Sequence, residues 1–149
     1  LWFDGQAEEA MQFYTSVFRN SKAGHVARMP EGGPGPAGNV LTASFELEGL
    51  QFTALNGGPM FKFTEATSFH VSCETQEEVD YYWDKLSAGG SIQMCGWVKD
   101  KFGLSWQIVP VHLNQFLSSP DKGKAQRVMQ AMLQMKKIVI ADLEQAAKG

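Results

Sequence analysis

VLTASFELEGLQFTAL, at residues 40–55, is the stretch that determines how this chain folds. Before the turn, apolar and polar side chains alternate strictly; the apolar ones are Leu41, Ala43, Phe45 and Leu47, and the polar ones Thr42, Ser44 and Glu46. After Glu48-Gly49 the apolar positions resume at every second residue, with Leu50, Phe52 and Ala54. Alternation with a period of two is typical of strands that bury one face, and a glycine between two such runs favours a hairpin. The stretch therefore predicts an antiparallel hairpin with one face against a core.

On both sides of this hairpin the sequence predicts further strands and, before each hairpin, an amphipathic helix. Residues 7–18 and 75–86 carry apolar side chains at the spacing of an amphipathic helix. Residues 68–73 alternate as a strand, and residues 94–99 and 104–109 flank a second turn at residues 100–103.

The two halves also resemble each other in sequence. Residues 8–14, EEAMQFY, align with residues 77–83, EEVDYYW, and residues 49–52, GLQF, align with residues 103–106, GLSW. The matches occur in the same order, which indicates an internal duplication. We predict one α+β domain over residues 1–149, with βαβββ modules at 1–56 and 68–111 and a helical tail at 112–149. In the tail, Ser119 is the expected N-cap and Pro120 the first helical residue, and a last helix is expected at 140–147.

Composition excludes several classes of function. The chain has 149 residues, 44% hydrophobic and 19% charged, with a net charge of −3, which fits a packed domain that binds neither nucleic acid nor an anionic membrane. No apolar run is long enough to span a membrane, and no signal peptide is recognisable. Cys73 and Cys95 form no motif, so reduced thiols in a cytoplasmic protein are expected. Because the chain starts within an apolar run at Leu1, further residues of the first strand are expected before it.

Four stretches carry a resemblance to a known superfamily: LWFDGQAEEAMQFY (1–14), ALNGGPMFKFTEATSF (54–69), CGWVKDKFGLSWQIVP (95–110) and KAQRVMQAMLQMKKI (124–138). With the tandem βαβββ halves, they resemble the glyoxalase/bleomycin-resistance, or vicinal oxygen chelate, superfamily, and within it the PhnB-like branch labelled demethylubiquinone methyltransferase-like. The resemblance implies curved mixed sheets with helices on their convex faces, a homodimer that exchanges elements, and in many members a divalent metal in the cup.

The metal positions that the resemblance implies carry the wrong side chains here. They map to Thr53, Ser68 and Gln107, and the fourth position precedes Leu1. First-row divalent metals prefer imidazole, thiolate and carboxylate ligands, so we predict no cofactor and no standard metal site.

Strand parity predicts which residues line the cup instead. If the helices cover the apolar faces, the opposite faces present polar side chains suited to a small molecule. The predicted ligand-binding residues are Ser44, Thr53, His70, Ser105 and Gln107, with Trp2 and Phe3 as a wall.

Two other functions stay open at this point. His70 with Glu46 could form a displaced metal site or an acid–base pair in an isomerase, lyase or dioxygenase-like enzyme. Alternatively, the chain is a dimeric interaction module whose cup is vestigial. Methyltransferase activity is not expected, because the chain lacks the parallel βαβ sheet with a glycine-rich first turn that most such enzymes use. The proline- and glycine-rich residues 32–38 form a loop that could act as a lid.

Overall fold

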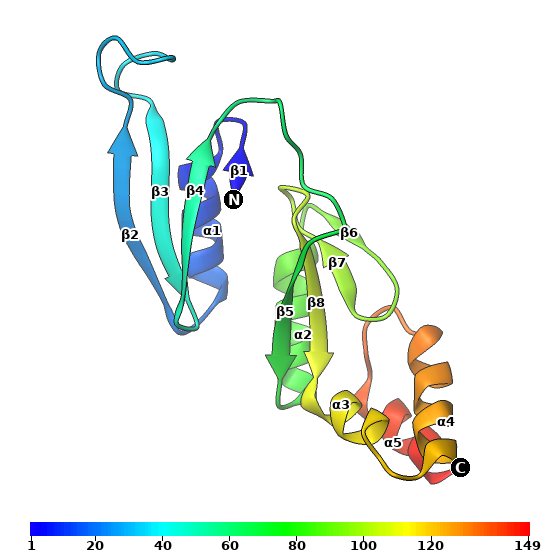
Figure 1. Cartoon of the computed structure of the whole chain (residues 1–149). Helices are drawn as coiled ribbons and strands as arrows, with labels where there is room; N and C mark the ends of the chain where they lie inside the picture. The colour runs from blue at the N-terminus through cyan, green and yellow to red at the C-terminus, as the bar shows by residue number, and fades with distance from the viewer. The chain divides into compact units, whose positions relative to one another are not determined.

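The computed structural model describes all residues, 1–149, and divides them into two compact units, residues 1–63 and residues 64–149. Each unit has its own sheet and its own helices, and each is described by itself (Figure 1). None of the helices has the length and the apolar character that crossing a membrane requires.

Unit 1 is one βαβββ module. Its elements are β1 (Trp2–Phe3), α1 (Ala7–Val17), β2 (Ser21–Arg28), β3 (Val40–Leu47) and β4 (Leu50–Asn56). The sheet has the order β1-β4-β3-β2, with β1 parallel to β4 and the other neighbours antiparallel. The helix α1 lies against one face of this sheet (Figure 1).

Unit 2 repeats the arrangement and adds a tail. Its module consists of β5 (Ser68–Cys73), α2 (Gln76–Ser87), β6 (Ser91–Ile92), β7 (Trp97–Lys99) and β8 (Ser105–Pro110). The sheet order β5-β8-β7-β6, with β5 parallel to β8, is that of unit 1. Helices α3 (Val111–Leu117), α4 (Lys122–Leu133) and α5 (Ile140–Lys148) follow. The predicted α+β fold of tandem βαβββ modules with a C-terminal helical extension is confirmed.

The core of unit 1 follows the predicted parity. Ala43, Phe45 and Leu47 of β3 are buried, as are Ala10 and Tyr14 of α1. The Tyr14 and Phe45 rings stack with centroids 5.8 Å apart. The hairpin turn has φ values of 49° at Glu48 and 81° at Gly49, as the tightest two-residue hairpin turn requires. The hairpin thus holds its apolar face against α1 and leaves the other face open.

The core of unit 2 is built the same way around α2. Val71, Cys73, Val98, Trp106 and Ile108 are buried on the sheet, and Val79, Trp83 and Leu86 are buried on the helix. Thr75 is the N-cap of α2, and its hydroxyl accepts a hydrogen bond from the Glu78 amide at 3.2 Å.

The tail helices have a small core of their own, which joins them to the end of β8. Val109, Leu113, Val128, Ile138 and Leu143 form one buried cluster. The Arg127 guanidinium donates to the carbonyls of Ala146 and Ala147 at the end of α5, where cations are favoured by the helix dipole.

Gln76 at the start of α2 anchors the chain that leads into α5. Its Oε1 accepts from the Ile140 amide at 2.8 Å, and its Nε2 donates to the Ile138 carbonyl at 3.2 Å and to Asp80 at 3.1 Å. Lys137 Nζ lies 2.7 Å from the same Asp80 carboxylate. One amide side chain and one ion pair therefore connect the tail to the module.

The Asp80 contacts predict a pH dependence for this anchor. Hydrogen bonds from Lys137 and then Gln76 lower the pKa of Asp80 below its ordinary value of 3.8. A lowered folded-state pKa stabilises above the unfolded pKa, and the contribution is lost as pH falls through the folded pKa. Because the pair is largely exposed, we expect about 0.5 kcal/mol or less. The protection of the amides of residues 137–140 against exchange, relative to the intrinsic rate at each pH, should fall below pH 4 in the native chain and change less in Asp80→Asn; an equal fall in both proteins would contradict this.

Several elements differ from the sequence prediction. The strand expected from Met94 begins only at Trp97, because Cys95 and Gly96 have φ values of 61° and 81° and their amides donate to Met135 and Lys136 of the tail. The N-cap of α4 is Asp121, not Ser119, and Pro120 precedes the helix. Strands β2 and β6 and helix α3 were not predicted.

Candidate functional site

The open face of the unit 2 sheet, opposite α2, presents two rows of side chains across three strands. Cross-strand pairing places Trp97, Gln107 and His70 in one row of β7, β8 and β5. The neighbouring row consists of Lys99, Ser105 and Ser68. Directly paired residues share a face of the sheet. Since their neighbours Val98, Trp106 and Val71 are buried with α2, both rows lie on the other side.

The polar groups of these rows contact one another. Gln107 Nε2 donates to Ser68 Oγ at 2.9 Å, which joins two of the three positions that the sequence resemblance mapped to metal ligands. His70 is exposed, and its Nδ1 lies 3.4 Å from the Ser72 hydroxyl. Ser105 is fully buried, and its hydroxyl has no hydrogen-bond partner in the protein. Sequence parity thus placed these residues on one face, although Ser105 is not accessible at the surface of the isolated chain.

Charge is nearly absent from the middle of this face. Lys99 pairs with Glu65, and hydrogen bonding to Lys99 is the main cause that lowers the pKa of the Glu65 carboxyl. Further along β8 on the same face, Val109 packs into the tail cluster. The face is therefore bounded by an ion pair at one end and by apolar packing at the other.

The open face of unit 1 is also polar. Ser44 Oγ donates to the His25 carbonyl at 3.1 Å, and Gln51 donates a hydrogen bond to Glu46. Thr53 is exposed on the same side. Glu46 is therefore held by a neighbour of its own unit, and His70 lies in the other unit.

Trp2 and Phe3, predicted together as a wall, point to opposite faces. Trp2 is half-buried, its indole donates to the Gly58 carbonyl at 2.8 Å, and its ring packs edge-on against Phe61 at 4.9 Å. Phe3 is buried on the α1 side and contacts Phe63. Adjacent residues of a strand always separate in this way.

The side chains at the positions that the resemblance implies for metal ligands are poor ligands for a divalent metal in either unit. Thr53, Ser68 and Gln107 offer hydroxyl and amide oxygens, and the Gln107–Ser68 hydrogen bond uses one of each residue's polar groups. No three His, Cys, Asp or Glu side chains gather where they could hold a metal ion. Neutral oxygen ligands of this kind bind a first-row metal weakly.

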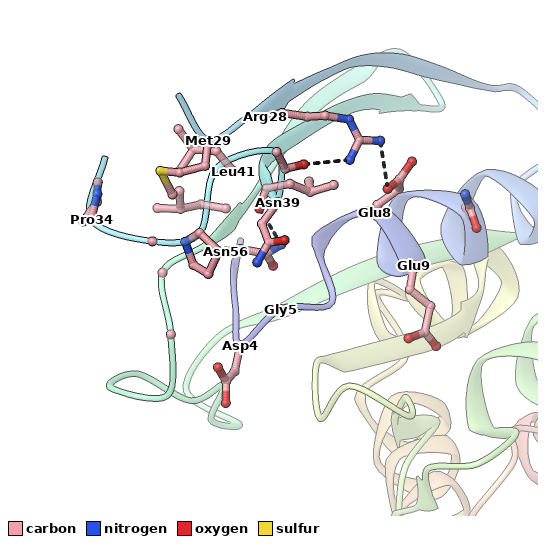
Figure 2. A pocket seen from close by; sticks show the side chains of 18 residues that line it. Asp4, Gly5, Glu8, Glu9, Arg28, Met29, Pro34, Asn39, Leu41 and Asn56 are labelled. Carbon is pink, nitrogen blue, oxygen red and sulfur yellow. Dashed lines mark hydrogen bonds and ion pairs between the residues drawn. The ribbon is translucent and has the colours of Figure 1, made fainter. Parts of the chain in front are cut away.

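A cavity of about 960 Å³ lies elsewhere in unit 1, at the ends of the strands, and the sequence did not predict it (Figure 2). The first turn of α1 lines one side, and the loop between β2 and β3 lines another. Asp4, Glu8, Glu9 and Arg28 are among the residues that line it, and the Glu8 carboxylate points toward the Arg28 guanidinium (Figure 2).

Arg28 connects the two sides of this cavity. Its Nη1 donates to the Gly38 carbonyl at 3.1 Å, and its Nη2 lies 3.9 Å from Glu8. Pro34, Gly35 and Pro36, from the loop considered as a lid, line the cavity. Movement of this loop stays a prediction. The sequence shows both an acidic start of α1 and a proline- and glycine-rich loop. It does not show that they meet, because strand β2, which brings them together, was not predicted.

A smaller hollow of about 410 Å³ lies in unit 2, between the start of α2 and the start of α5. His112 lines it with a buried Nδ1 that has no hydrogen-bond partner. The two thiols are unpaired. Burial raises the pKa of Cys73 to about 12, so this thiol carries little thiolate at neutral pH.

The fold and the open faces define a class: tandem βαβββ proteins whose helices cover one face of each sheet and leave a polar face open. The chain belongs to the family described as 3-demethylubiquinone-9 3-methyltransferase, whose model matches residues 1–109. The tail from residue 110 onward lies outside that match.

Two solved structures illustrate the relationship. The PhnB protein from Bacillus cereus is 41% identical, with a TM-score of 0.68, over 74% of this chain and 95% of its own. A Pseudomonas aeruginosa protein that is 20% identical has a TM-score of 0.62 over 74% of this chain and 92% of its own, and shows the fold alone. No curated protein matches the chain.

Proposed function

We propose that this chain binds an organic small molecule on its open sheet faces without a metal ion, as a metal-free member of the vicinal oxygen chelate superfamily. The hydrogen bond from Gln107 to Ser68 carries the proposal, because it joins an amide and a hydroxyl at the positions where that superfamily holds its metal. Polar but uncharged groups on one face are suited to orienting a small ligand.

The family description names a methyltransferase, and the proposal does not include that activity. Both sheets are βαβββ sheets in which only the first and last strands of each module run parallel. A fold shared with a family supports an architecture, while an activity has to come from the site.

We infer further that the protein works as a homodimer. Each four-stranded sheet has two edge strands within its unit, and unpaired edges favour pairing with another chain. Unpaired Cys73 and Cys95 support a reducing, cytoplasmic compartment. Sedimentation equilibrium at micromolar concentration tests the dimer; a mass of one chain throughout would contradict it.

Thermal-shift screening against a metabolite library tests the binding function. A ligand at about a hundred times its dissociation constant adds roughly 2.7 kcal/mol, which raises the melting temperature by roughly 5–10 °C. Gln107→Ala should abolish most of this shift, while Gln130→Ala, an exposed glutamine of α4, should leave it unchanged. Absence of any shift across the library would sink the proposal and favour a vestigial cup.

Metal analysis tests the other half of the proposal. After loading with Zn²⁺, Mn²⁺ or Ni²⁺ and desalting, the protein should retain well under one ion per chain, and His70→Ala should not change that value. One retained ion per chain, lost in His70→Ala, would instead support a displaced metal site at His70.

A further inference from the structure

Trp97 is the one aromatic residue of the two rows on the open face of unit 2. Cross-strand pairing puts it beside Gln107, whose other neighbour is His70. The next residue, Val98, is fully buried on the α2 side, whereas Trp97 is only half-buried. The indole is therefore not part of the helix-side core, and part of its surface is available on the open face.

The groups around the indole are polar but carry no unpaired charge. Gln107 keeps its Oε1 as an acceptor while its Nε2 contacts Ser68, and His70 is exposed. Lys99, the one charged residue of the two rows apart from any charge on His70, is paired with Glu65. Within the two rows, the Lys99–Glu65 pair leaves no ammonium or carboxylate group free for a charged ligand.

We propose that this face binds an uncharged, planar ring compound with a carbonyl or amide edge, and that Trp97 determines this specificity. The ring would stack on the indole, while its polar edge would meet Gln107 and His70 in the same row. The inference rests on the proposed binding function and adds the chemical class of the ligand. The sequence did not indicate that Trp97 lies on the open face. The register of β7 depends on Cys95 and Gly96, whose positive φ values the sequence pattern does not reveal.

Three bicyclic probes test this class of ligand. The first is 2-quinolone, which is planar and uncharged with a lactam edge; octahydro-2-quinolone keeps the lactam without the planar ring, and quinoline-2-carboxylate keeps the ring with a charge. Titrations are followed by the indole ¹H–¹⁵N signals of the whole protein, and Trp97→Phe assigns the Trp97 signal. We expect 2-quinolone to shift that signal saturably and to bind at least fivefold more tightly than the other two probes.

The variants separate stacking from folding. Trp97→Leu should weaken 2-quinolone binding by about tenfold, and Trp97→Phe by about threefold or less, because a phenyl ring still stacks. Phe61→Leu removes another exposed aromatic ring, in unit 1, and should leave binding unchanged. Circular dichroism and melting temperature verify that each variant is folded.

Several results would overturn the inference. No saturable shift with 2-quinolone up to about 10 mM would do so, as would equal binding of the saturated or charged probe, or unchanged affinity in Trp97→Leu. A Trp97 signal that changes with protein concentration but not with probe would show that a second copy covers this face. In each case, a library compound whose stabilisation depends on Gln107 would leave the broader binding function intact.

Discussion

Replacing Asp100 by Asn should destabilise unit 2 by about 2–4 kcal/mol, which at the size of this unit lowers its melting temperature by roughly 10–25 °C. Asp100 is 2% exposed and lies in the turn between β7 and β8. Its Oδ1 accepts from the amides of Phe102 and Leu104 at 2.9 and 3.0 Å, and its Oδ2 accepts from the Trp106 indole at 2.8 Å. A carboxylate is acceptor-only, and all three partners are donors.

Asparagine fits this site in shape but not in polarity. Its Oδ1 can still accept from the two amides, but its Nδ2 then faces the Trp106 indole, donor against donor. Removing the indole donor should therefore offset part of the loss, so Trp106→Phe should cost less in the Asp100→Asn background than in the native chain. Urea unfolding of the four proteins of this cycle measures the coupling. Asp84→Asn, at an exposed position of α2, is the matched control and should change stability by less than about 0.5 kcal/mol.

Two results would show that the turn does not depend on the carboxylate. One is that the changes in the free energy of unfolding are additive in that cycle; the other is that Asp100→Asn lowers this free energy no more than Asp84→Asn does. The outcome matters for the binding face, since this turn sets the register of β7 against β8. Lys99 and Ser105, which flank the turn, pair with each other in the outer row of that face. A loosened turn should therefore also weaken the alignment of Trp97 with Gln107.

The sequence predicted those elements in which the pattern of apolar and polar side chains matches the buried and exposed faces. Alternation in β3 and in β5 gave the buried and open faces, because each strand packs one face on a helix. Helices α1 and α2 carry apolar stripes that match their buried residues. The edge strand β2 was missed because most of its side chains are exposed, so no alternation marks it.

The candidate site was predictable only as far as strand register was. Ser68, His70 and Gln107 share a face by parity alone, and the structure places them together. Trp97 required the start of β7, which is fixed by contacts of Cys95 and Gly96 with the distant tail. The cavity of unit 1 required the β2–β3 loop to meet α1. Contacts between segments far apart in sequence leave no local pattern, so these features had to come from the structure.

The second large effect should come from the tail, where Leu143→Ala is expected to cost about 3–5 kcal/mol. Leu143 is fully buried in the cluster with Val109, Leu113, Val128 and Ile138. Truncating a buried leucine loses its transfer free energy and leaves a cavity that packed neighbours fill only in part. Leu133→Ala removes the same atoms from a side chain that is 50% exposed in α4, and it should cost less than about 1 kcal/mol.

The comparison also tests whether the tail, which lies beyond the family match, belongs to the fold of unit 2. Val109 is the last β8 residue on the open face before Pro110, and Gln76 joins the tail to α2. If tail and module unfold together, Leu143→Ala should lower the protection of β8 amides along with those of α5 in hydrogen exchange. Loss of protection confined to α4 and α5, with β8 unchanged, would show that the tail is a separate unit. In that case the open face that carries Gln107 would not depend on the tail for its structure.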